Sequence, residues 1–228
     1  MRVLRGRAAS IEADRKVTRE LLAVAGETRE PALRVWTPGR QLAFGRRDAN
    51  EPGYEEARRI AENTGFPPVE RSVGGRAVAY TGTTLAFARV VPIDDARKGL
   101  DTRYDEASER LQSALAELGI GAERGEPPNS FCPGAHSLSA SGKLVGIAQR
   151  ITQNAALVSG VVIVADHEEI ADVLRSVYNA LSVPFDPDSV GSVALAGGPA
   201  APERVARAIE DELVGDREKR IERVDRKP

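Results

Sequence analysis

The chain has 228 residues, of which 41% are hydrophobic and 29% are charged, and its formal net charge is −2. This composition is typical of a folded globular protein and excludes a disordered or membrane-spanning chain, because the longest apolar run, around residues 158–165, is too short to cross a bilayer. The N-terminus has no apolar signal core, and a single cysteine cannot form an internal disulfide. We therefore expect a cytoplasmic protein with no membrane partner. The near-neutral charge, without a basic stripe, also argues against a nucleic-acid partner.

The first half of the chain alternates helical and extended patterns. An amphipathic helix is predicted over residues 11–25, ending near a glycine, and is followed by strands at 32–36 and 41–45. Helical spacing returns over residues 51–64 until a proline pair stops it. Residues 77–91 then predict two strands around a glycine turn.

The second half begins with the clearest helix, over residues 103–118, whose leucines and alanines recur at three- and four-residue steps. Residues 143–150 and 155–165 predict strands, and residues 166–181 predict a helix that Asp166 can cap. A proline- and glycine-rich connector leads to a helix over about 202–213 and a charged tail that we expect to be frayed. Because this order lacks a regular βαβ rhythm, it predicts an α/β or α+β domain with a mixed sheet.

A glycine pair, Gly74-Gly75, interrupts the stretch "ERSVGGRAVAY" at residues 70–80. Such a pair lets backbone amides approach a ligand closely, and Arg71 could add a forked cation for a phosphate or carboxylate. A plain hairpin turn explains the same residues, because one Gly-Gly pair is a weak signal. The local pattern leaves both interpretations open.

Cys132 precedes Pro133-Gly134, a pair that bends the chain and places the thiol on a loop. A thiolate there can accept an acyl group as a thioester and pass it to an amine, with Lys143 or His136 supplying positive charge or a base. A cysteine that serves only as a small buried apolar residue fits the sequence equally well.

Lys143 begins the predicted strand "KLVGIAQR", in a chain with only five lysines. Gly146 and Ala148 remove side chains from one face of this strand and leave room for a linear chain, whereas strict alternation places Lys143 on the other face. At the strand entrance Lys143 could bind a carbonyl or phosphoryl oxygen, although a lysine at a turn is usually solvated. No HExxH or CxxC pattern is present, so we predict no metal site.

In this order, the three stretches resemble the lipoyl/octanoyl transferase and lipoate–protein ligase family, whose catalytic domain is related to that of biotin–protein ligases. The resemblance rests on residues 42–48, 71–78 and 131–150. The Cys-Pro-Gly block followed by "GKLVGIAQR" is most similar to the cysteine-dependent branch, the octanoyl-[glycine cleavage protein H]:protein N-octanoyltransferases. The residues that match the family motifs are Arg71, Gly74, Gly75, Ala77, Val78, Cys132, Lys143, Gly146, Ala148 and Gln149.

The resemblance implies a mixed, mainly antiparallel sheet flanked by helices, like that of class II aminoacyl-tRNA synthetases and biotin–lipoyl ligases. It also implies a catalytic domain over residues 1–195, followed by a C-terminal helix and charged tail over residues 196–228. Cys132 would be the nucleophile and Lys143 would orient the acyl carbonyl. The other matched residues would bind the substrate, and no cofactor or metal would be needed.

The implied partners are an octanoyl or lipoyl donor and lipoyl-domain proteins, namely glycine cleavage protein H and the acyltransferase subunits of 2-oxoacid dehydrogenases. One alternative is an ATP- and Mg-dependent lipoate–protein ligase in which Lys143 holds the carboxylate and the α-phosphate. Another is a non-catalytic homologue that binds lipoyl domains. Arg76 replaces the usual third glycine of the motif, where it would obstruct a nucleotide or add charge to the mouth of the site.

Overall fold

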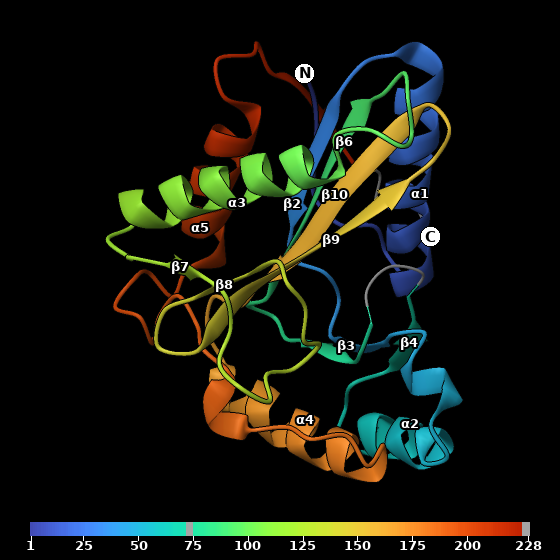
Figure 1. Cartoon of the computed structure of the whole chain (residues 1–228), viewed down its shortest axis with the longest axis vertical. Helices are drawn as coiled ribbons and strands as arrows, with labels where there is room; N and C mark the ends of the chain where they lie inside the picture. The colour runs from blue at the N-terminus through green and yellow to red at the C-terminus, as the bar shows by residue number, and fades with distance from the viewer. Residues whose placement is uncertain (72–74, 225–228) are drawn as a thin grey trace.

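The computed structural model describes residues 1–71 and 75–224. Within these residues, one sheet has eight strands in the order β11-β1-β2-β6-β10-β9-β8-β7 (Figure 1). Its strands, in chain order, are β1 (Arg2–Arg5), β2 (Ala32–Trp36), β6 (Leu85–Pro92), β7 (Glu123–Arg124), β8 (Ser137–Ser139), β9 (Lys143–Ile151), β10 (Ala155–Val162) and β11 (Arg220–Arg223).

A smaller sheet has three strands in the order β4-β3-β5 among the described residues. They are β3 (Gln41–Phe44), β4 (Pro68–Glu70) and β5 (Val78–Tyr80). Strand β1 is parallel to both of its neighbours and β3 is parallel to β4, whereas the other neighbouring pairs are antiparallel. The predicted mixed, mainly antiparallel fold is therefore confirmed. The two strands predicted around the turn at 81–84 do form, but β5 and β6 belong to different sheets.

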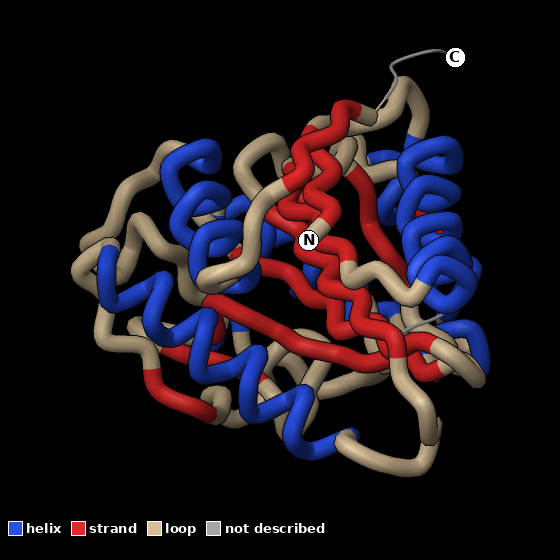
Figure 2. The backbone as a smooth tube through the Cα atoms, turned by 90° about the horizontal axis from the view of Figure 1, so that it is seen from above, coloured by secondary structure: helices blue, strands red, loops and turns tan. Residues whose placement is uncertain are grey.

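Helices cover both faces of the large sheet (Figure 2). Because strand side chains alternate, Leu33 and Val35 pack in the core with α3 (Leu100–Glu117) and α5 (Pro202–Val214), whereas Ala32 packs with α1 (Ile11–Thr28) on the other face. Helices α2 (Tyr54–Asn63) and α4 (His167–Ala180) pack on the small sheet. Two short 3₁₀ helices, η1 (Asp48–Asn50) and η2 (Pro187–Ser189), lie in the connections.

Two helix ends differ from the prediction. Helix α1 continues two residues past Gly26, to Thr28, and the chain leaves the helix at Arg29, whose φ is 61°. Asp166 stands at the start of α4, but its side chain does not cap that helix. It accepts a hydrogen bond from Thr83 Oγ1 instead, because the left-handed backbone of Asp166 turns the carboxylate away from the first helical turn.

The described part of the charged tail, up to residue 224, is more ordered than expected. Residues 220–223 form β11, which pairs in parallel with β1 over four residues. The prediction of a frayed tail is therefore wrong for this part, since β1 offers an unpaired edge to which the chain can add. Side chains of α5 lie in the main core, so residues after the predicted boundary at 195 pack with those before it. No helix among the described residues is long and apolar enough to cross a membrane.

Candidate active site

A cavity of about 660 Å³ lies where the two sheets approach each other, and the loop at residues 131–137 forms part of its wall. Most of the residues matched to the family motifs line this cavity: Arg71, Gly75, Val78, Cys132, Lys143, Gly146, Ala148 and Gln149. Ala77 is fully buried, and its carbonyl accepts a hydrogen bond from Tyr178. Gly74 lies outside the described residues. The fold thus brings together segments separated by up to 78 positions.

The thiol of Cys132 lies against a guanidinium group. Arg71 Nη2 donates a hydrogen bond to Cys132 Sγ at 2.9 Å, and the same nitrogen donates to the carbonyl of Arg76. Burial raises the pKa of the Cys132 thiol, but the charge of Arg71 opposes this, aided by the backbone amides of Arg76 and Gly75 and by the charge of Lys143. The pKa therefore lies below its ordinary value, which is the condition for a nucleophilic thiolate.

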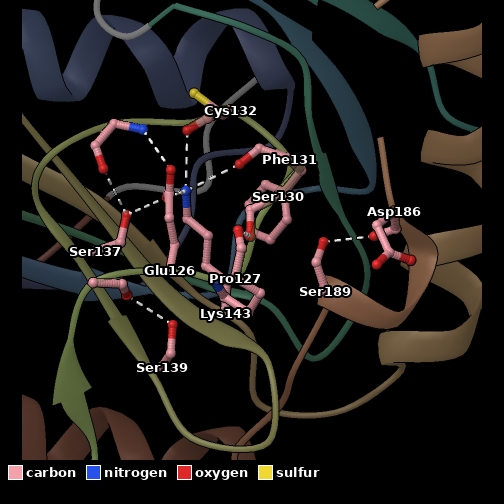
Figure 3. Close-up of polar contacts among 12 residues, drawn as sticks. Glu126, Pro127, Ser130, Phe131, Cys132, Ser137, Ser139, Lys143, Asp186 and Ser189 are labelled. Carbon is pink, nitrogen blue, oxygen red and sulfur yellow. Dashed lines mark hydrogen bonds and ion pairs between the residues drawn. The ribbon is translucent and has the colours of Figure 1, made fainter. Parts of the chain in front are cut away.

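Lys143 is 1% exposed, so the interpretation of a solvated surface lysine is wrong. Its Nζ donates to Glu126 Oε2 at 2.6 Å and to the carbonyls of Phe131 and Cys132, both at 3.0 Å (Figure 3). These three acceptors account for the three N–H bonds of the ammonium group. Lys143 therefore holds the backbone of the loop that carries the thiol.

The face of β9 on which Lys143 lies also differs from the prediction. Opposite β8, Leu138 pairs with Val145 and Ser139 pairs with Lys143, so two steps along β9 match one step along β8. This bulge interrupts the alternation of side chains. As a result Lys143 Cε lies 3.6 Å from the position that a Cβ on Gly146 would occupy, so the lysine shares the open face of the strand.

Sequence reasoning did not find Glu126, which organises the loop. Its Oε2 accepts from Lys143 and from Ser137 Oγ at 2.8 Å, and its Oε1 accepts from the amide of Gly134 at 2.9 Å (Figure 3). Glu126 precedes a proline pair in an irregular segment, and such a segment carries no periodic signal that would mark the carboxylate as part of the site.

His136 and Arg76 take positions other than those considered from the sequence. The ring of His136 stacks on Tyr104 with centroids 3.5 Å apart, and Arg71 contacts the thiol instead. Arg76 Nη1 lies 2.6 Å from Glu51 Oε1 and 3.4 Å from Asp48 Oδ1. The guanidinium of Arg76 therefore pairs with these carboxylates and is not part of the cavity wall.

The profile of the lipoyl protein ligase A/B catalytic domain family matches residues 11–213. The chain belongs to this family. Among its relatives, an octanoyl-[GcvH]:protein N-octanoyltransferase of Bacillus velezensis is 30% identical over 166 residues, covering 70% of this chain and 57% of the relative. One from Exiguobacterium sp. is 31% identical over 134 residues, covering 58% and 48%. The matched segments thus span about half the length of these curated relatives.

Solved structures of the family have the same fold. A crystal structure of lipoate-protein ligase A bound with ATP superposes with a TM-score of 0.77 at 18% identity, covering 98% of this chain and 88% of the ligase. The bipartite lipoate protein ligase of Thermoplasma acidophilum, studied with its E2 lipoyl domain, gives a TM-score of 0.72 at 18% identity, covering 98% and 87%. Among the described residues of this chain, no group of three or more His, Cys, Asp or Glu side chains is placed to hold a metal ion.

Proposed function

We propose that this chain acts as a cytoplasmic octanoyltransferase that carries the acyl group on Cys132. The donor is an octanoylated protein of the glycine cleavage protein H type, and the acceptor is a lysine of another lipoyl domain. The observation that carries the proposal is the contact of 2.9 Å between Arg71 Nη2 and Cys132 Sγ, which favours the thiolate. The names of the relatives support the same donor and the same reaction.

The reaction proceeds in two exchanges that balance without a cofactor. The thiolate attacks the carbonyl carbon of the octanoyl-lysine amide, the C–N bond breaks, and the released amine takes up the proton that the thiol gave up. The amine of the acceptor lysine then attacks the thioester, the C–S bond breaks, and the thiol is restored with the proton that the amine loses. One amide is replaced by another, so neither ATP nor Mg²⁺ is consumed.

The cavity provides a place for the acyl chain. Gly146 and Ala148 leave one face of β9 open, and apolar side chains such as Phe87 and Val161 complete the wall. Burying the octanoyl methylenes there contributes about 0.8 kcal/mol for each buried CH₂. Lys143 binds the carbonyl groups of Phe131 and Cys132, so that Cys132 stays in the wall of this cavity.

The test is intact-protein mass spectrometry after incubation with octanoylated glycine cleavage protein H, with and without ATP and Mg²⁺. We expect one octanoyl mass on Cys132 without ATP, and no adduct and no transfer in Cys132→Ser. Acyl transfer from free octanoate or lipoate only when ATP is present would instead support the ligase alternative. Binding of a lipoyl domain with neither adduct nor transfer would support the non-catalytic alternative.

A further inference from the structure

The backbone of Cys132 is held from both sides. Its amide donates a hydrogen bond to Tyr178 Oη at 2.6 Å, and its carbonyl accepts from Lys143 Nζ at 3.0 Å. Its φ is 42°, in the left-handed region that L-residues other than glycine adopt only where the surroundings impose it. The two hydrogen bonds are therefore the local restraints that hold Cys132 in this conformation.

Tyr178 also contacts the segment that follows the glycine pair, at Ala77. Its side chain is fully buried in α4, and its ring lies 5.0 Å from that of Phe185, measured between centroids. The hydroxyl that accepts from Cys132 donates in turn to the carbonyl of Ala77 at 3.0 Å. Ala77 follows Gly75 and Arg76, whose backbone amides help to lower the pKa of the Cys132 thiol. One hydroxyl therefore connects the loop that carries the sulfur to the segment that stabilises its charge.

The hydroxyl of Tyr178 does not exchange protons in the reaction. Burial raises the pKa of Tyr178 well above its ordinary value, and the negative charge of a Cys132 thiolate raises it further. The hydroxyl thus stays protonated at neutral pH and keeps its hydrogen bond to Ala77. Its contribution is geometric, because its hydrogen bonds go to the backbone of Cys132 and Ala77 and its side chain does not line the cavity.

We propose that Tyr178 is a positioning residue: by linking the amide of Cys132 to the carbonyl of Ala77, it keeps the thiol at the guanidinium of Arg71. The proposal rests on the proposed function, in which Cys132 is the nucleophile. The peptide between Phe131 and Cys132 is held at its amide by Tyr178 of α4 and at its carbonyl by Lys143 of β9, so loss of the tyrosine hydroxyl leaves the amide of Cys132 without its partner and lets the peptide tilt about the remaining bond. The sulfur then moves away from Arg71.

The experiment uses Tyr178→Phe, which removes one oxygen and keeps the ring. The rate of alkylation of Cys132 by iodoacetamide is measured across pH in the free protein, together with kcat and KM for octanoyl transfer. We expect alkylation at neutral pH to fall by roughly tenfold and its pH profile to move to higher pH, because the thiolate loses its stabilising partner. We expect kcat to fall with little change in the KM for the donor.

The matched control is Tyr54→Phe. Tyr54 is a buried tyrosine of the same core cluster, and its hydroxyl donates to Glu70 rather than to the loop. We expect the pH profile of Cys132 alkylation in Tyr54→Phe to match that of the wild-type protein, even if both variants melt at a lower temperature. An unchanged profile in Tyr178→Phe, or an equal shift in both variants, would overturn the proposal.

A second measurement, hydrogen exchange, uses the wild-type protein and so does not require any variant to fold. Hydrogen exchange of the Cys132 amide in the unmodified protein is expected to be slow, because this amide is bonded to a buried hydroxyl. Exchange as fast as in a free loop would overturn the proposal. Alkylation and hydrogen exchange are both measured without an octanoyl donor. A chain that never forms the acyl thioester would therefore disprove the proposed function, while these two measurements would still test whether Tyr178 positions the thiol.

Discussion

Among the groups that lower the pKa of the Cys132 thiol, the guanidinium of Arg71 contributes most. Burial lowers the pKa of the Arg71 guanidinium, but the neighbouring Cys132 raises it above the ordinary value, so the side chain stays positive at any working pH. Each charge favours the other, and a buried pair of this kind is worth more than an exposed one because water screens it less. A histidine in the place of Arg71 would lose its charge near neutral pH.

Replacing Arg71 with glutamine is expected to move the pH profile of acyl transfer. Arg71 lowers the pKa of Cys132, so in the unmodified protein the thiolate forms, and the rate reaches its plateau, at a lower pH than in Arg71→Gln. The loss at neutral pH is expected to be about tenfold or more and to shrink as the pH rises. Initial rates measured from about pH 5 to pH 10 test this, with the wide range chosen to bracket ordinary thiol titration.

Arg71→Lys is the matched control, because it keeps a positive charge and loses the forked geometry. Its profile should lie between those of the unmodified protein and Arg71→Gln. A loss of the same size at every pH in Arg71→Gln would mean that Arg71 binds substrate without affecting the thiol.

Gly146 of β9 and Gly160 of β10 lie on neighbouring strands but have different surroundings. A Cβ on Gly146 would meet Lys143 Cε at 3.6 Å and Val161 Cγ1 at 3.7 Å, which are ordinary contacts. A Cβ on Gly160 would lie 2.3 Å from the carbonyl oxygen of Gly146 and 2.5 Å from Phe87 Cε1. The absence of a side chain at Gly146 thus leaves space in the cavity, whereas at Gly160 it allows β10 to pack closely.

Substitutions at these two positions should therefore affect different measurements. Gly146→Leu is expected to fold and to lower transfer of octanoyl relative to butanoyl by about tenfold, because loss of room for one or two methylenes costs about 1–3 kcal/mol. Gly160→Ala is expected to lower the free energy of unfolding by about 1–3 kcal/mol through overpacking. A competition assay with octanoyl and butanoyl donors measures the first effect. Urea denaturation measures the second. Unchanged chain-length preference in Gly146→Leu would place the acyl chain elsewhere.

The two ends of the described chain pair with each other at one edge of the large sheet. Strand β1 lies between β11 and β2, and Glu210 of α5 accepts from Arg5 Nη2 at 2.6 Å and from Lys219 Nζ at 3.1 Å. Glu210 is 5% exposed, so its charge depends on these two partners. The C-terminal residues therefore belong to the same cooperative unit as the first strand.

Removal of residues 216–228 is expected to lower the free energy of unfolding by about 2 kcal/mol or more, since β1 loses its backbone hydrogen bonds to β11 and Glu210 loses Lys219. The alkylation profile of Cys132 should not change, because its partners come from the segment between β4 and β5, from β9 and from α4. Urea denaturation and alkylation of the truncated chain measure the two properties. An unchanged urea midpoint would show that β11 adds nothing to the fold.

Much of the secondary structure is predictable because it depends on local spacing. The strand at 32–36 has the same bounds in the structure, and the last helix, predicted over 202–213, ends one residue later. Cys132 and Lys143 are recognisable as candidate site residues through the resemblance of their stretch to the family motif, although their local patterns leave a buried thiol and a solvated lysine open. These features depend on neighbours within a few positions, which a sequence displays directly.

The partners of those residues come from long-range contacts, which apolar periodicity does not encode. Arg71 meets Cys132 across 61 positions and Tyr178 meets it across 46, so neither pair has a local signature. Lys143 and Gly146 share a face because a bulge forms only when β9 pairs with β8. The sequence by itself therefore determines which side chains are available, whereas the pairing of strands and the packing of α4 bring Arg71 and Tyr178 to hydrogen-bonding distance of Cys132.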